Sequence, residues 1–144
     1  MSDADTYAHE CRIRDAFAAR LGELRPAERL VGTEILYDVP GARADMRTVD
    51  DGQTVREWEF KIEADYSSLG QALVYVALAR RAYEFKRPVR GVVAAFSFPD
   101  HIAYANEAMN LGLELVEIPL WLRQAGGYLG GPPAEGVVIP SIDP

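Results

Sequence analysis

The sequence predicts a single α/β domain whose helices and strands occur in the order α-β-β-β-α-β-α-β. Three observations support this class. Some stretches repeat apolar residues at helical spacing, others alternate as strands do, and residues 89–98 are almost continuously apolar. Such a run is typical of a strand that is covered on both faces. The 144 residues are enough for one domain with a hydrophobic core.

The first half of the chain is predicted to form a helix and then three strands. Apolar residues from Ile13 to Leu24 mark one face of a helix over residues 5–24, which Pro26 ends. Turn signals rich in Pro, Gly and Asp then separate three strands, which we expect over residues 29–39, 42–49 and 55–62.

The second half is predicted to alternate between helices and strands. A long helix begins at a cap formed by Ser67 or Ser68 and continues to about Phe85. A buried strand, a helix and a last strand follow, over residues 89–98, 100–111 and 113–118. We therefore place the domain at residues 1–118.

Residues 119–144 are rich in Gly and Pro and form a predicted C-terminal extension. We expect this extension to pack on the domain or on a protein partner. Residues 137–139 could add a strand. A generic α/β interaction domain that dimerises through this segment is one alternative for the whole chain.

Composition excludes several classes of protein. Cys11 is the only cysteine, so neither an internal disulfide nor a cysteine-rich metal site is expected. No apolar run is long enough to span a membrane, and the polar N-terminus does not resemble a signal peptide, so a cytoplasmic location is expected. The formal net charge of −7 is unusual for a protein that binds nucleic acid.

The third predicted strand carries a polar face that suggests chemistry. Side chains alternate along a strand, so Glu59 and Lys61 lie opposite the apolar Trp58 and Phe60. Pairing across the preceding hairpin can bring Asp45 beside Glu59. Two carboxylates on neighbouring strands suit Mg²⁺ or Mn²⁺, and a nearby lysine can hold the attacking water. The plainer alternatives are an ion pair with Arg43 or Arg47 and a solubilising lysine.

Asp45 followed by Glu59-Phe60-Lys61 resembles the motif of the PD-(D/E)xK nuclease superfamily, although Ala44 replaces the proline. Gln71 and Tyr75 resemble the QxxxY motif of its RecB-like branch, and they share one helix face. Glu10 resembles an acidic residue that many members carry on the first helix. The resemblance covers residues 5–118 and implies a restriction-endonuclease-like αβββαβ core with a mixed sheet.

The resemblance implies a nuclease that uses Mg²⁺ or Mn²⁺ and acts on DNA more than on RNA. Asp45, Glu59, the carbonyl group of Phe60 and Glu10 would hold the metal, and Lys61 would position the attacking water. Gln71 and Tyr75 would orient Lys61 or contact a phosphate. Small members of the superfamily often act as homodimers, for example as junction resolvases, which are structure-specific endonucleases. The QxxxY motif instead favours exonucleases. Both activities are therefore kept as alternatives.

Plainer interpretations accompany these assignments. Glu10 could instead pair with Arg14, and Gln71 and Tyr75 could form the polar stripe of a half-buried helix. We expect Glu57 to be a hydrated strand start, and both histidines, His9 and His101, to lie on the surface. A nuclease-fold module that binds nucleic acid or a protein without cutting is the main alternative function.

A cluster of basic residues could form a local positive patch, although the net charge of the whole chain is negative. If these side chains line one rim of the site, they would form a track for phosphates. The alternative for those at the end of the long helix is a favourable interaction with the helix dipole. The residues concerned are Arg43, Arg47, Arg80, Arg81, Lys86 and Arg87.

Overall fold

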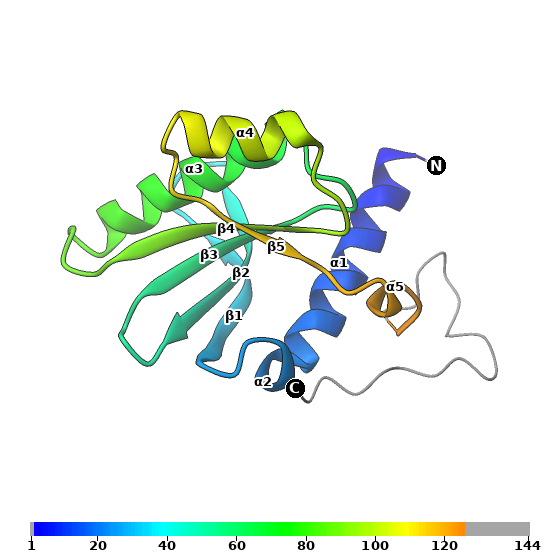
Figure 1. Cartoon of the computed structure of the whole chain (residues 1–144). Helices are drawn as coiled ribbons and strands as arrows, with labels where there is room; N and C mark the ends of the chain where they lie inside the picture. The colour runs from blue at the N-terminus through cyan, green and yellow to red at the C-terminus, as the bar shows by residue number, and fades with distance from the viewer. Residues whose placement is uncertain (1, 126–144) are drawn as a thin grey trace.

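A mixed sheet of five strands with helices on both faces is the centre of residues 2–125, the part that the computed structural model describes (Figure 1). The α/β class predicted from the sequence is confirmed. In chain order the elements are α1 (Asp3–Ala19), α2 (Leu21–Leu24), β1 (Glu28–Leu36), β2 (Arg43–Asp50), β3 (Val55–Phe60), α3 (Tyr66–Ala82), β4 (Val89–Ala95), α4 (Asp100–Ala108), β5 (Glu114–Glu117) and α5 (Trp121–Ala125).

The strands lie side by side in the order in which they occur in the sequence. β1, β2 and β3 form an antiparallel meander, whereas β3, β4 and β5 run parallel to one another. Parallel neighbours need a crossover connection, and α3 and α4 supply these two crossovers. As a result, the carboxyl ends of β3, β4 and β5 meet at one end of the sheet.

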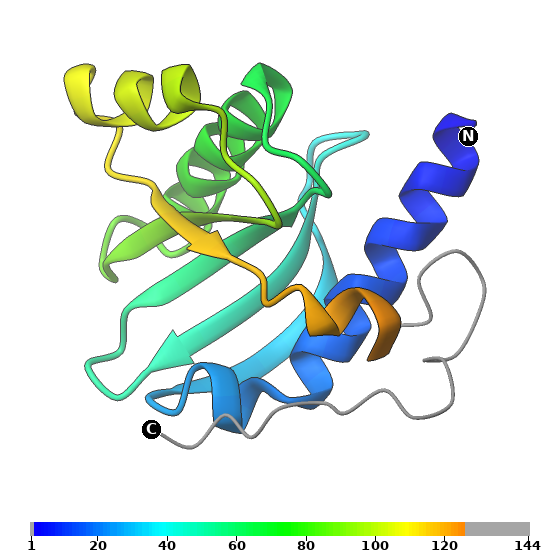
Figure 2. The same ribbon diagram turned by 45° about the vertical axis from the view of Figure 1, so that its right-hand side comes forward.

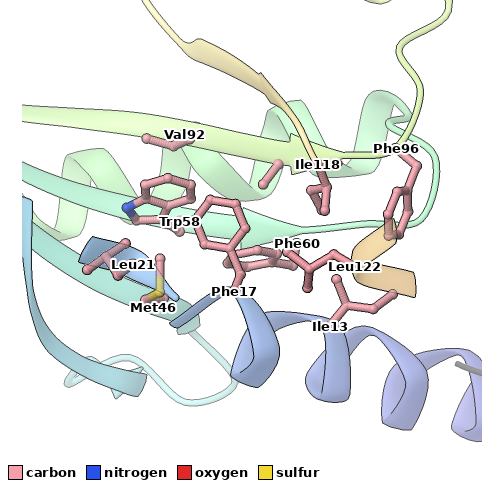
Figure 3. Packing of buried hydrophobic residues seen from close by; sticks show 11 residues of the cluster. Ile13, Phe17, Leu21, Met46, Trp58, Phe60, Val92, Phe96, Ile118 and Leu122 are labelled. Carbon is pink, nitrogen blue, oxygen red and sulfur yellow. The ribbon is translucent and has the colours of Figure 1, made fainter. Parts of the chain in front are cut away.

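One face of the sheet is covered by α1 and α5. Ile13 and Phe17 of α1 pack against Met46, Trp58 and Phe60, all of which are buried (Figure 3). The ring centroids of Phe17 and Trp58 lie 5.4 Å apart, in a tilted contact. This packing fixes which side of β3 is apolar, so its other side chains must face the opposite way.

The other face is covered by α3, which lies mainly over β4 and β3. Gly91 of β4 permits this close approach, because a Cβ atom there would lie 2.6 Å from Leu113 Cδ2 and 2.8 Å from Val76 Cγ2.

Two helix boundaries differ from the prediction. The first helix ends at Ala19, and Arg20, with φ −113° and ψ 21°, separates it from the short α2. Asp65, and neither Ser67 nor Ser68, caps α3: its carboxylate accepts from Ser68 N at 2.8 Å. Ser68 Oγ accepts from Asp65 N in return, which forms a capping box.

The short helix α5 lies within the predicted C-terminal extension. Its Leu122 is fully buried and joins the cluster formed by α1 and the sheet (Figure 3). The expectations for a strand at residues 137–139 and for contact with a partner fall outside the described residues. In the part that is described, none of the helices has the length and apolar character needed to cross a membrane.

Candidate active site

A hollow of about 590 Å³ opens beside the carboxyl end of β3. Its walls come from the N-terminal half of α1, the turn between β1 and β2, and α3. Figure 2 shows this turn rising between α3 and α1. The structure brings eight of the predicted site residues together around the hollow: Glu10, Arg43, Asp45, Glu59, Phe60, Lys61, Gln71 and Tyr75.

Asp45 and Glu59 lie on neighbouring strands, as the hairpin pairing predicts. The β2–β3 register pairs Met46 with Trp58, and one further step sets Asp45 beside Glu59. Asp45 Oδ2 accepts a hydrogen bond from Phe60 N at 2.7 Å. Burial, and then repulsion from Asp45, raise the pKa of Glu59 to about 9. These two carboxylates thus form an acidic pair in which Glu59 is buried and Asp45 is half-buried.

Glu10 reaches the same hollow from α1. Its carboxylate accepts from Ile62 N at 3.1 Å, just beyond the end of β3. Burial raises its pKa, against the opposing charge of Lys61. The alternative pairing with Arg14 is not observed, because the guanidinium of Arg14 contacts Asp15 at 2.9 Å and lies 3.8 Å from Glu34.

Lys61 follows β3 directly, and its backbone is held in place. Lys61 N donates to Ala94 O at 2.9 Å, which continues the pairing of β3 with β4. In the described part of the chain its ammonium group makes no ion pair, although its charge lowers the pKa of Glu10, Asp45 and Glu59. A lysine positioned in this way can bind water or a phosphate oxygen.

Gln71 and Tyr75 project from α3 into the hollow. Gln71 Oε1 is buried and has no hydrogen-bond partner within residues 2–125. Tyr75 is buried and stacks on Tyr37, with ring centroids 5.9 Å apart and planes at 15°. Burial, and then the neighbouring Glu59, raise the pKa of Tyr75. An unpaired amide oxygen inside a polar hollow leaves one acceptor for a ligand or water.

The donor set suits a hard divalent cation. Among residues 2–125, no three His, Cys, Asp or Glu side chains gather in a way that could hold a metal by themselves. Mg²⁺ does not require such a cage, because it keeps several waters and takes one or two carboxylates together with substrate phosphates. Asp45 and Glu59 supply two such carboxylates side by side at the hollow.

The predicted basic residues are not all brought to this hollow. Arg43 lies at its edge, with its guanidinium over the ring of Tyr7, 5.4 Å from the centroid. Arg47 pairs with Glu57, and Arg81 pairs with Asp38 at 3.1 Å. The remaining three basic residues lie at the C-terminal end of α3 or just after it: Arg80, Lys86 and Arg87. Binding of nucleic acid by these six residues stays a prediction.

Two sequence-based expectations are wrong. Glu57 is fully buried rather than a hydrated strand start. Arg47 donates to its two carboxylate oxygens at 2.5 and 3.1 Å, and the Tyr37 hydroxyl also donates to it. His9 is likewise 1% exposed, because its helix face packs inward. No sequence signal marked Tyr37, since its partners lie far away along the chain.

Neither a known protein family nor a curated protein matches the sequence. Solved structures do match in three dimensions. One is an EndoMS complex with double-stranded DNA, with TM-score 0.61 and 18% identity over 83% of this chain. Another is a repair endonuclease from Pyrococcus abyssi, with TM-score 0.58 and 23% identity over 72% of this chain. EndoMS without ligand gives TM-score 0.55 and 20% identity over 74%.

This chain has the fold of these endonucleases. The prediction of a mixed sheet flanked by helices in the endonuclease-like arrangement is thereby confirmed. The chain spans just under half of each matched chain, at 47%, 46% and 43% of their lengths. At these identities the likeness concerns the fold, and activity has to be argued from the site.

Proposed function

We propose that this chain is a nuclease domain that uses Mg²⁺ or Mn²⁺ to hydrolyse phosphodiester bonds in DNA. The observation that carries the proposal is the meeting of Asp45, Glu59 and Lys61 in one hollow. These residues come from two strands of an endonuclease-like fold. A lysine beside two carboxylates can serve metal-assisted hydrolysis of a phosphate ester, because the carboxylates can hold the cation and the ammonium group can bind the water or a phosphate oxygen.

Asp45 and Glu59 would hold the cation, with the Phe60 carbonyl as a further oxygen ligand and Glu10 contributing through a water molecule. A bound Mg²⁺ or Mn²⁺ supplies neutralisation of the negative charge that builds up on the phosphate under attack. The hydrogen bond from Phe60 N holds the Asp45 carboxylate in place before any ligand arrives. This preorganisation removes part of the cost of assembling the site.

Hydrolysis adds water across one phosphorus–oxygen bond and leaves a phosphomonoester and a hydroxyl group. The ammonium group of Lys61 holds the attacking water or a phosphate oxygen through hydrogen bonds. Gln71 Oε1, which lacks a partner, accepts a hydrogen from that water. Tyr75 supports Glu59 from the side of α3, and Arg43 at the edge of the hollow binds a neighbouring phosphate.

DNA is the favoured substrate because the matched structures include an endonuclease complex with double-stranded DNA. A cleavage assay determines which form of nucleic acid the protein cuts. Purified protein is incubated with labelled single strands, duplex, nicked duplex, a four-way junction and RNA, with Mg²⁺, Mn²⁺ or EDTA. Asp45→Asn and Lys61→Ala are assayed beside the wild type, and Arg29→Ala, which removes an exposed basic side chain of β1, serves as the control.

We expect metal-dependent cleavage that both site variants lose and that Arg29→Ala retains. Calorimetry with Mn²⁺ is run in parallel, because it detects the metal site without any turnover. Full activity of Lys61→Ala would exclude its assigned role. If the wild type neither cuts any substrate nor binds metal, the chain is a non-catalytic module of nuclease fold.

A further inference from the structure

A second hollow, of about 680 Å³, lies at the end of the sheet opposite the candidate active site. It is formed by the C-terminal half of α3, the start of β4 and the segment between α4 and β5, at the left of Figure 1. Its lining is largely apolar, with Leu73, Val76, Pro88, Leu111 and Leu113 among its residues. None of the described residues that line it is acidic.

Three arginines surround this hollow: Arg80, Arg87 and Arg90. Each is held by a backbone carbonyl group: Arg80 Nη2 donates to Val89 O at 3.2 Å, Arg87 Nη2 to Gln53 O at 3.0 Å, and Arg90 Nη2 to Gly112 O at 3.1 Å.

Within the described residues none of these three guanidinium groups makes an ion pair. The arrangement differs from that of most other arginines in this acidic chain. Arg47, Arg56 and Arg81, for example, each pair with a carboxylate. A guanidinium group has five N–H donors, so a carbonyl contact leaves several of them available. The three arginines therefore form a fixed cluster of positive charge beside an apolar surface.

Phe85 adds an exposed aromatic ring to the same hollow, with 75% of its surface accessible. Its backbone lies in the left-handed region at φ 59°, as does that of Glu84 at φ 55°. This conformation is uncommon for residues with a side chain. Phe85 N donates to Arg80 O at 2.8 Å, which stabilises the turn and keeps the ring at the edge of the hollow.

We propose that this hollow binds a peptide segment of a partner protein that carries carboxylates beside an apolar side chain. The arginines would bind the carboxylates, while Phe85 and the leucines would bury the apolar side chain. A nucleic acid strand would use the positive charge but would leave the concave apolar lining unfilled. The proposal is independent of the nuclease activity, because the two hollows share no residue.

The test uses the full chain labelled with ¹⁵N and two short synthetic peptides. One peptide has a Leu-Phe pair flanked by aspartates, and the other has asparagines in their place. Arginine Nε signals and backbone amides are followed by NMR, and affinity is measured by fluorescence anisotropy. A labelled single-stranded oligonucleotide is titrated separately. The variants are Arg90→Glu and Phe85→Asn, and Arg29→Glu is the charge-matched control on exposed β1.

We expect the aspartate peptide to shift signals of Arg80, Arg87, Arg90 and Phe85. Its affinity should fall at least tenfold in Arg90→Glu and Phe85→Asn and stay unchanged in Arg29→Glu. Asparagine replacement should abolish binding. Absence of binding, or equal binding by all variants, would overturn the proposal. So would binding of the oligonucleotide alone at these residues, since that assigns the hollow to nucleic acid. Asp45→Asn should bind the peptide normally, whatever its cleavage activity.

Discussion

Glu57 and Glu59 lie two residues apart on the same strand and the same face, and both are buried. Their surroundings differ completely. Glu57 is bound by the guanidinium of Arg47 and by the Tyr37 hydroxyl. Glu59 instead lies beside Asp45 and near Glu10, with Lys61 as the nearby cation that lowers its pKa.

This difference in surroundings makes Glu57 a structural carboxylate and leaves Glu59 available for a ligand. A buried charge is tolerated when a partner of opposite charge and hydrogen bonds compensate it. Glu57 has this compensation from the protein itself. Glu59 lacks most of it, so its charged form is stabilised mainly by something that enters the hollow. The following variants test this contrast.

Glu59→Gln should have the largest effect, and on activity rather than on stability. Under the proposed function we expect cleavage to fall about a thousandfold, which corresponds to roughly 4 kcal/mol of lost transition-state stabilisation. The free energy of unfolding without metal should stay the same or rise, because the cost of burying an ionisable carboxyl group disappears together with the repulsion from Asp45. Single-turnover cleavage and urea unfolding measure the two quantities. A large loss of stability would show that Glu59 is structural.

Glu57→Gln should show the reverse pattern. Removing one partner of a buried ion pair leaves the guanidinium of Arg47 without its counter-charge, at a cost of about 3 kcal/mol in unfolding free energy. Under native conditions the folded fraction should keep metal binding and cleavage within a few-fold of the wild type. If cleavage is abolished while stability is unchanged, Glu57 belongs to the active site.

Much of the fold could be predicted because local patterns and packing agree. Alternation along β3 assigned Trp58 and Phe60 to the core, where they are found. The cap of α3 was misplaced because Ser67, Ser68 and Asp65 all have suitable side chains, and only the backbone geometry selects Asp65. The break at Arg20 likewise depends on tertiary packing that no local signal marks.

The site residues from the sequence motif meet in one hollow, but their neighbours could not be predicted. Glu57 and Glu59 are equivalent in an alternating pattern, and the partners that distinguish them come from elsewhere in the chain. Arg47 pairs across a hairpin, and Tyr37 arrives from β1 through a turn. Likewise, Arg80 lies on the same helix as Gln71 and Tyr75, and Arg87 follows that helix, yet both lie at its far end, away from the site.

The pH dependence of stability should report on both buried carboxylates of β3, and most strongly on Glu59. The pKa of Glu59 rises from 4.5 to about 9 in the folded protein, so the folded state binds the extra proton between these pH values. Its contribution to stability is therefore full below pH 4.5 and is lost as the pH rises toward 9. Thermal unfolding of metal-free protein should show at least about 1 kcal/mol less stability at pH 9 than at pH 6.

Glu59→Gln should reduce this slope and leave the smaller part that comes from Glu57, whose pKa burial raises to about 8, and saturating Mg²⁺ should oppose the slope in the wild type. A slope that persists unchanged in Glu59→Gln would mean that another group titrates.

Tyr37→Phe tests the connection between the two regions and should have the smallest effect. Tyr37 donates to Glu57 and stacks on Tyr75, which in turn lies beside Glu59. Phenylalanine keeps the stacked ring but loses the hydrogen bond, so we expect about 1 kcal/mol less stability and a loss of activity below tenfold. Tyr37→Ala, which removes the ring as well, should lower activity further by releasing Tyr75. Equal activity of the two variants would show that the stacking does not position Tyr75, and that the structural and the ligand-accessible carboxylate act independently.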